Sequence, residues 1–177
     1  MSETKENDAR RQLTLILIVA SLSLGGSYAL FYLARGSEGW GTTNNGAFVD
    51  PPSTITELGW STQDGATLST SGQWWLWTVA AQCKEACTET LKNLRATHIL
   101  LNREAKRVRR GITTSSDYTP PSDQPDLLGI RTTSPQPSPG VYIVDPLGNL
   151  VFFYALDTNP KLILKDLKKL LKVSQIG

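Results

Sequence analysis

The sequence has one histidine and two cysteines among its 177 residues. A single histidine excludes a histidine-rich metal cluster, and a Ser/His/Asp triad would have to use His98. The sequence has neither a Gly-rich phosphate loop nor an internal repeat. A formal net charge of only +2 gives no support for nucleic-acid binding. If the chain carries out chemistry, that chemistry starts at the two cysteines.

Charged residues are absent from positions 12–34, which are dominated by Leu, Ile, Val and Ala. Such a run is long enough to cross a bilayer as a helix. A cleaved signal peptide is the alternative, but the run exceeds a usual signal core and no convincing small-x-small cleavage site follows it. We therefore expect a disordered polar tail at 1–11, a transmembrane anchor at 12–35, a linker at 36–45 and one outer domain at 46–177.

The charges that flank the apolar run predict its orientation. Arg10 and Arg11 precede it, whereas only Arg35 follows it closely. The positive-inside rule then places the N-terminus in the cytoplasm. In a bacterium, the anchor would lie in the inner membrane and the outer domain in the periplasm, where disulfides persist.

The two cysteines lie where an apolar run changes into a helical pattern. Residues 74–80 are aromatic, β-branched or small, which predicts a buried strand. From Lys84 onward, apolar residues recur every three or four positions, as on one face of a helix. Cys83 and Cys87 would open this helix, where unpaired N–H groups and a partial positive charge favour thiolate over thiol.

Three roles fit two thiols at this spacing, and the residues alone leave all three open. A low-pKa thiolate can attack a disulfide while the second cysteine resolves the product. Two thiolates can bind Cu(I). The pair can also form a static disulfide that only pins the turn.

Turn residues and periodicity predict the other elements of the outer domain. A hairpin at 57–68 turns near Asp64-Gly65, and a basic strand at 107–114 would leave its arginines on a solvated edge. The predicted elements that follow are a loop at 115–139 with one helical turn at 126–130 and a hairpin at 141–154. A last helix, capped by Thr158 or Asn159 and with Pro160 at its first position, would run to about Val173.

This order of elements resembles the thioredoxin-like proteins anchored to bacterial membranes. The Sco/SenC family shares the spacing of Cys83 and Cys87 and the turn Asp145-Pro146-x-Gly148. The tail VDPLGNL...PKLILKDLKKLLKVSQIG is similar to a small family of cytochrome-oxidase-associated membrane proteins. The resemblance implies an α/β, thioredoxin-like domain, a central sheet with helices on both faces, on a single N-terminal transmembrane helix.

The resemblance also implies a function: assembly or maintenance of a respiratory cytochrome c oxidase by thiol-disulfide exchange, Cu(I) handling, or both. Cys83 would attack the target or accept the metal, and Cys87 would resolve the intermediate or co-ligate. The partners would be oxidase subunits or copper-delivery proteins, besides the lipid bilayer. The chain would then be a possible thiol-disulfide oxidoreductase.

Copper-binding Sco proteins use a histidine whose position falls here at about Pro137. His98 lies eleven residues beyond Cys87, roughly 16 Å along a helix, and cannot replace it. We therefore expect His98 to be a packed helix residue and a full Cys/Cys/His copper site to be missing. Two-coordinate Cu(I), or a third ligand from a partner, stays possible.

Pro139 is the third candidate site residue. Thioredoxin-fold reductases that resemble this chain carry a cis-proline about nine residues before the turn glycine, and Pro139 has that spacing to Gly148. We therefore expect a cis bond at Ser138-Pro139 that packs against the cysteines.

The alternative function is a non-catalytic accessory protein of the oxidase with a structural disulfide. A general periplasmic thiol reductase is a further alternative.

Overall fold

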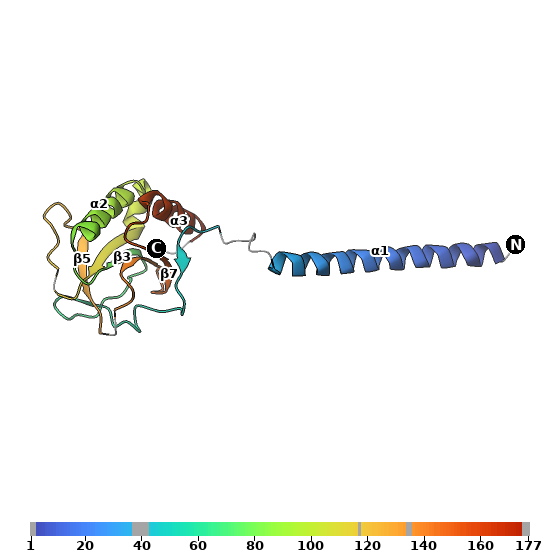
Figure 1. The fold of residues 1–177 in the computed structure, drawn as a ribbon, viewed down its shortest axis with the longest axis horizontal. Helices are drawn as coiled ribbons and strands as arrows, with labels where there is room; N and C mark the ends of the chain where they lie inside the picture. The colour runs from blue at the N-terminus through green and yellow to red at the C-terminus, as the bar shows by residue number, and fades with distance from the viewer. Residues whose placement is uncertain (1–2, 37–42, 117, 134–135, 175–177) are drawn as a thin grey trace. The chain divides into compact units, whose positions relative to one another are not determined.

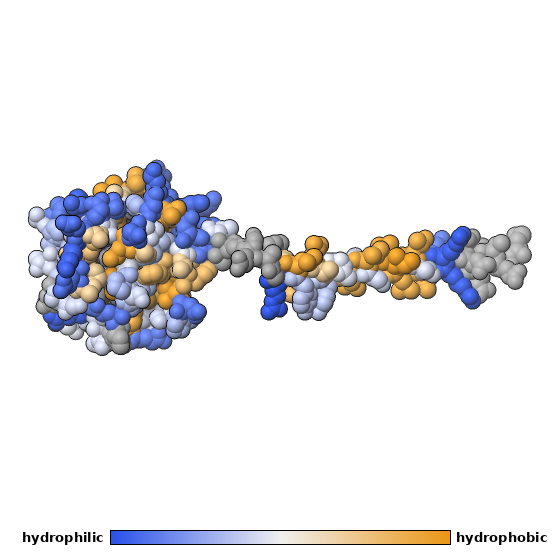
Figure 2. Space-filling view, in the orientation of Figure 1, coloured by the Kyte–Doolittle hydropathy of each residue, from blue (hydrophilic) through white to orange (hydrophobic). Residues whose placement is uncertain are grey.

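The computed structural model describes residues 3–36, 43–116, 118–133 and 136–174. They fall into two compact units, Met1–Thr43 and Asn44–Gly177. The first unit is built on helix α1, Glu3–Gly36 (Figure 1). Within α1, Arg10–Arg35 is long and apolar enough to cross a membrane. Its surface is largely apolar between its charged ends (Figure 2).

The expected disorder of the N-terminal tail is wrong for the residues that the structure describes. α1 already begins at Glu3, well before the apolar run. Residues 3–11 contain neither Gly nor Pro, and several of them are good helix formers, so the apolar helix can continue into them. The predicted linker lies mostly at residues 37–42, outside the described residues.

The second unit holds a mixed sheet whose described strands follow the order β1-β7-β6-β3-β4-β5-β2. β3 lies at the centre, parallel to β4 and antiparallel to β6. The strands are β1 Ala47–Phe48, β2 Ser61–Thr62, β3 Trp74–Val79, β4 Val108–Thr113, β5 Leu127–Arg131, β6 Gly140–Val144 and β7 Leu150–Tyr154. The helices are α2 Glu85–Ile99, the 3-10 helix η1 Asn102–Arg107 and α3 Pro160–Val173.

Local sequence signals explain the elements that were predicted correctly. The hairpin of β6 and β7 turns at Gly148, whose φ of +95° suits glycine. The Asp145 carboxylate accepts hydrogen bonds from the backbone N–H groups of Leu147 and Asn149, at 2.9 and 2.8 Å. At the start of α3, the Asn159 side chain accepts a hydrogen bond from the Lys161 N–H at 3.0 Å.

The two faces of the sheet are covered differently. α2 and α3 lie side by side over one face, where Leu94 and Leu167 pack against Leu76 (Figure 1). On the opposite face, Trp60 packs against Trp75 and Trp77, with ring centroids 5.5 and 4.8 Å apart. The expectation of helices on both faces is therefore wrong. In the part of the chain that the structure describes, an irregular apolar segment around Trp60 covers the second face in place of a helix.

The predicted hairpin at 57–68 is present as a short antiparallel pair, in which Ser61 bridges Thr67. The Leu68 N–H donates to the Trp60 carbonyl at 3.0 Å, and the Thr62 N–H donates to the Ala66 carbonyl at 2.8 Å. Strand β2 of this hairpin also pairs with β5, which joins the hairpin to the sheet.

Strand β5 overturns two further predictions. Residues 127–131 are extended beside β4, not a helical turn, so β4 is an inner strand. Arg110 is consequently 1% exposed, and it donates hydrogen bonds to Gln124 and to the Asp126 carboxylate, both at 2.8 Å. Burial by itself would raise the pKa of Asp126, but the hydrogen bond and charge of Arg110 lower it below its ordinary value.

Asp166 on α3 fixes the point where the chain enters the domain. Its carboxylate accepts hydrogen bonds from the Asn45 N–H (2.6 Å), the Asn45 side chain (2.7 Å), the Gly46 N–H (3.0 Å) and the Tyr154 hydroxyl (2.8 Å). Asp166 is 1% exposed. Burial would raise the pKa of Asp166, but these hydrogen bonds together lower it. Burial and the nearby carboxylate raise the pKa of Tyr154.

We predict that Asp166→Asn destabilises the domain by about 3 kcal/mol at pH 7, because an amide cannot accept from all four donors. Folding lowers the pKa of Asp166, so its stabilisation is present above the unfolded value of about 3.9. The stabilisation is lost as the pH falls through the lower pKa of the folded state. The difference between wild type and variant should therefore shrink in acid. Urea unfolding of the full chain in detergent, followed by tryptophan fluorescence, measures it.

The control is Asp157→Asn, which removes an exposed carboxylate just before α3. It should change the free energy of unfolding by less than about 0.5 kcal/mol. Equal effects of the two variants would contradict the role assigned to Asp166.

Candidate functional site

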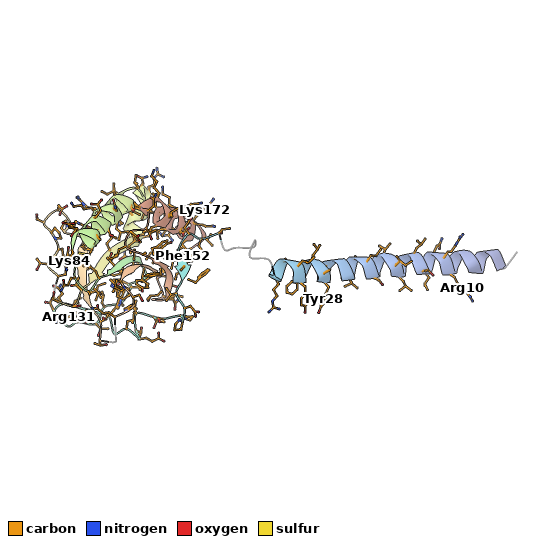
Figure 3. The ribbon with its side chains drawn as sticks, in the orientation of Figure 1. Arg10, Tyr28, Lys84, Arg131, Phe152 and Lys172 are labelled. Carbon is orange, nitrogen blue, oxygen red and sulfur yellow. A yellow bond between two sulfur atoms is a disulfide. The ribbon has the colours of Figure 1, made fainter. Side chains whose placement is uncertain are left out.

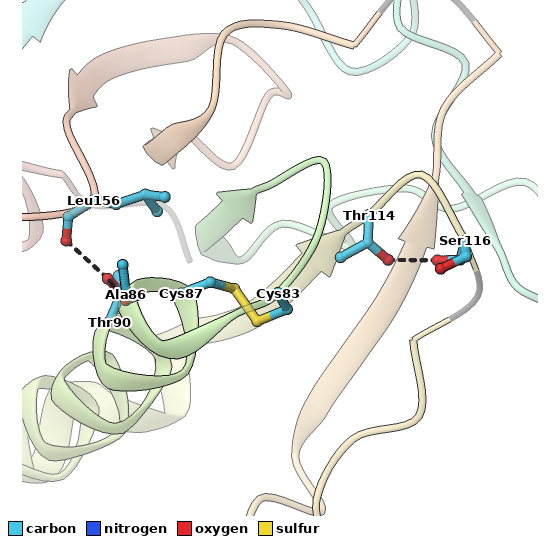
Figure 4. The surroundings of a disulfide bond; sticks show 7 residues. All are labelled: Cys83, Ala86, Cys87, Thr90, Thr114, Ser116 and Leu156. Carbon is cyan, nitrogen blue, oxygen red and sulfur yellow. Dashed lines mark hydrogen bonds between the residues drawn. A yellow bond between two sulfur atoms is a disulfide. The ribbon is translucent and has the colours of Figure 1, made fainter.

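The two cysteines form a disulfide where β3 gives way to α2 (Figure 4). Their Cα atoms are 5.0 Å apart. Cys83 follows the end of β3 and is half-buried, whereas Cys87 lies in the first turn of α2 and is 2% exposed. One sulfur is therefore accessible to a partner, and the other is held behind it.

The N-terminus of α2 provides the electrostatic setting of Cys83. Lys84 occupies the N-cap position without a side-chain capping hydrogen bond. The first amide groups of a helix have no intrahelical carbonyl partner, and the helix dipole is positive at this end. Both effects favour a negative charge on a reduced cysteine beside the helix start. The opposing charge in the first turn is Glu85.

A hollow of about 400 Å³ flanks the cysteine segment. It is lined on one side by Gln82 and Lys84, the two neighbours of Cys83 in the chain, and on the other by Pro139 and Leu156. The structure thus places Pro139 in the wall of the same hollow as the two chain neighbours of Cys83. A catalytic role of Pro139 stays a prediction.

The predicted cis bond at Ser138-Pro139 is wrong. Among the described residues, the cis peptide bond is Asp50-Pro51. The trans isomer is the preferred one even before proline. In this arrangement the Ser138 carbonyl accepts a hydrogen bond from the Tyr142 hydroxyl at 2.9 Å, just before β6 begins. Burial raises the pKa of Tyr142 to about 12, so this hydroxyl remains protonated.

A second hollow of about 410 Å³ lies at the end of β4 and shares Ser115 with the first. Polar side chains contribute much of its wall, among them Gln63, Thr114 and Gln136. Tyr118 also lines it and packs against the same apolar cluster as Cys83. Burial, and secondarily the charge of Asp123, raise the pKa of Tyr118.

Apart from Pro139, sequence reasoning missed the residues that line these two hollows, although one signal pointed to them. The carboxyl ends of parallel strands meet at the same edge of a sheet, so the residues after β4 must lie near those after β3. The backbone confirms this, because the Ser115 N–H donates to the Ala81 carbonyl at 3.1 Å. The polar loop after Thr113 could therefore have been assigned to the site.

A hydrogen bond joins the cysteine helix to the segment that leads into α3. The Thr90 hydroxyl lies 2.7 Å from the Leu156 carbonyl oxygen and 2.8 Å from that of Ala86 (Figure 4). Thr90 is 6% exposed, and Leu156 also lines the first hollow. The disulfide and the start of α3 are thus parts of one packed end of the domain.

The donor set does not fit a three-ligand copper site. Within the described residues, no three side chains of His, Cys, Asp or Glu are grouped so that they could hold a metal ion. His98 is a packed residue, as predicted, because its Nε2 atom lies 2.8 Å from the carbonyl oxygens of both Ala105 and Val108. The position expected for a histidine ligand is occupied by Pro137, which has no donor atom in its side chain.

The family model for a transmembrane-like, thioredoxin-like C-terminal domain matches residues 74–174. The chain belongs to this family. The match begins at β3 and includes α2, both cysteines and α3. No curated protein matches the chain.

Solved structures show that this transmembrane-like, thioredoxin-like protein shares its fold with the Sco family. Apo Sco1 from Thermus thermophilus is 16% identical, covers 74% of this chain and 99% of its own, and has a TM-score of 0.51. Yeast Sco1 is 15% identical, covers 65% of this chain and 95% of its own, and has a TM-score of 0.50. At these identities the likeness confirms the predicted thioredoxin-like fold.

We predict that the two cysteines of the reduced protein react with iodoacetamide at different rates. Cys83 should be alkylated at least about tenfold faster than Cys87, because a buried thiol is both less accessible and harder to ionise. Mass spectrometry of the reduced full chain, sampled over time, measures the two rates. In guanidinium chloride the rates should become similar. Faster alkylation of Cys87 in the folded protein would contradict this geometry.

Proposed function

We propose that this protein is a membrane-anchored thiol-disulfide exchange factor that assists assembly or maintenance of a respiratory cytochrome c oxidase. The observation that carries the proposal is the disulfide between a half-buried Cys83 and a buried Cys87 at the start of α2. An attacking thiol must reach its target, and a resolving thiol must not compete with it. The two cysteines meet these two requirements separately.

The exchange begins with both cysteines reduced. The Cys83 thiolate attacks one sulfur of the target disulfide, forms a mixed disulfide and releases the first target thiolate. The Cys87 thiolate then attacks the Cys83 sulfur, which restores the internal disulfide and releases the second target thiolate. Two electrons pass from the cysteine pair to the target, and both released thiolates take up protons from water. A dithiol donor must reduce the pair before the next cycle.

The sequence resemblance supports the choice of target. The spacing of the cysteines, the Asp145-Pro146-x-Gly148 turn and the tail are similar to proteins associated with cytochrome oxidase. The target would be the cysteine pair of the oxidase copper centre, or that of a copper carrier. Such cysteines must be reduced before they can bind copper, because the thiolate is the ligand.

Cu(I) handling is the second candidate, with the metal as cargo. Yeast Sco1 has been solved with copper bound. In this chain, the two sulfurs of reduced Cys83 and Cys87 are the soft donors that Cu(I) prefers. Because the described residues offer no third donor beside them, a third ligand would come from the partner during transfer.

The location proposed for this reaction is the periplasmic side of a bacterial inner membrane. Arg10 and Arg11 before the apolar helix, against Arg35 after it, support a cytoplasmic N-terminus. The disulfide supports an oxidising compartment for the domain. An accessory protein whose disulfide is only structural is the alternative.

We predict that Cys87→Ser traps the target. Without the resolving thiol, the mixed disulfide at Cys83 persists and should appear as a covalent adduct on non-reducing gels of native membranes. Mass spectrometry of the adduct should find a copper-centre subunit of the oxidase or a copper carrier. The matched control Cys83→Ser retains the same number of thiols but should give at least tenfold less adduct, because Cys87 is buried.

The outcomes separate the candidates. No adduct with either variant would support the accessory protein. An adduct with unrelated periplasmic proteins would support a general thiol reductase.

The cargo role is tested by titrating Cu(I) into the reduced wild-type protein against a competing chelator. Copper binding that both serine variants abolish supports this role, and copper binding that either variant retains contradicts it.

A further inference from the structure

The outward surface of α3 is strongly cationic. We call its five exposed lysines the cationic face: Lys161, Lys165, Lys168, Lys169 and Lys172. The one acidic residue of the helix, Asp166, is buried and bonded to Asn45, Gly46 and Tyr154. The positive charge of the face is therefore not offset by an acidic side chain of the helix on the same surface. Figure 3 labels Lys172 near the C-terminal end of α3.

The chain that follows the anchor enters the domain beside α3. Asn45 and Gly46 are bonded to Asp166, in the middle of α3. The candidate membrane span ends at Arg35, so only ten residue steps separate its end from Asn45. A fully extended chain of that length reaches about 35 Å. The covalent tether therefore keeps α3, whatever the path of the linker, within about that distance of the membrane surface.

Exposed apolar side chains accompany the lysines. Phe48, two residues after Gly46, is 57% exposed, and its ring packs at a tilt of 53° against Phe152, with centroids 5.0 Å apart. Phe152 belongs to the same core cluster as Ile163 and Leu167 of α3, so Phe48 lies on the sheet face that α3 covers. On α3 itself, Val173 is 80% exposed. Lysines mixed with exposed apolar groups are typical of surfaces that lie on the lipid headgroup layer.

We propose that the cationic face of α3 binds the anionic phospholipid headgroups of the membrane in which the chain is anchored. Each lysine near an anionic surface gains electrostatic attraction, and five of them act together. The attraction extends only over a Debye length of roughly 8 Å at physiological salt, so it must be salt-sensitive. An acidic partner protein could offer the same charge, but the lipid surface is within reach of the tethered domain in every molecule, so we commit to the lipid.

This binding would place the cysteine pair as well. α2 and α3 cover the same face of the sheet, and the Thr90 hydroxyl links α2 to the Leu156 carbonyl just before α3. When α3 is bound to the headgroups, the disulfide lies on the same side of the sheet as α3. The domain would then act on cysteines that lie close to the membrane surface.

The test is lysine acetylation of the full chain in lipid nanodiscs. Discs of phosphatidylcholine alone are compared with discs that contain phosphatidylglycerol, and mass spectrometry measures the acetylation rate at each lysine. We expect the lysines of the cationic face to react at least about threefold more slowly in the phosphatidylglycerol discs. Lys92, which lies on α2 and outside the cationic face, serves as the internal control and should change less than twofold. About 1 M salt should abolish the difference, because the Debye length falls to roughly 3 Å.

A pair of matched variants tests whether the lysines cause the binding. Lys165→Gln with Lys168→Gln should reduce the protection of Lys161 and Lys172. The control Arg95→Gln with Arg109→Gln removes the same charge from exposed positions elsewhere and should leave the protection intact. Equal acetylation in the two kinds of disc would overturn the proposal. Protection that appears in native membranes but not in phosphatidylglycerol discs would also overturn it and would point to an acidic protein. Neither result depends on whether Cys83 exchanges disulfides.

Discussion

Burial of β3 on both of its faces is the constraint on which the rest of the domain depends. All six residues from Trp74 to Val79 are buried, so each face of the strand needs its own cover. α2 and α3 supply one cover, and the segment around Trp60 supplies the other. Because β3 pairs with β4 and β6 on its two sides, its end is fixed within the sheet. Cys83 therefore emerges at a set point, beside the loops that follow β4.

The site gains its chemistry from an asymmetry in this arrangement. Cys83 stays in the segment between strand and helix, where a partner can reach it, while the first turn of α2 carries Cys87 into the core. The single histidine is engaged with two backbone carbonyls at the other end of α2. Such a pair suits sequential attack and resolution by two thiols. It also suits brief Cu(I) transfer better than storage at a complete site.

Much of this could be predicted from sequence where local signals were strong. The β3 run, the helix that carries Cys87 and the Pro160 helix start each carry their own periodicity or cap. The expectation that Cys83 also lies in the first turn of this helix is wrong, because α2 begins at Glu85. β5 was missed because it is short and follows a proline-rich loop. Arg110 on the adjacent strand was also misleading: in the sequence it resembles a surface charge, but it is buried and paired with Asp126, the residue before β5. The trans bond at Pro139 follows the ordinary preference of X-Pro bonds. The cover of the second sheet face by the segment around Trp60 depends on long-range packing, which no local pattern encodes. Asn45 resembled linker for the same reason, since its partner Asp166 is 121 residues away.

The central claim is that the Cys83-Cys87 disulfide is exchanged in function and does not merely brace the turn. Its reduction potential tests this claim most directly, measured on the full chain in detergent by equilibration with dithiothreitol buffers of defined ratio. The account predicts a potential between roughly −270 and −120 mV, the range of thioredoxin-like exchange proteins. A potential below about −300 mV, typical of structural disulfides, would contradict it.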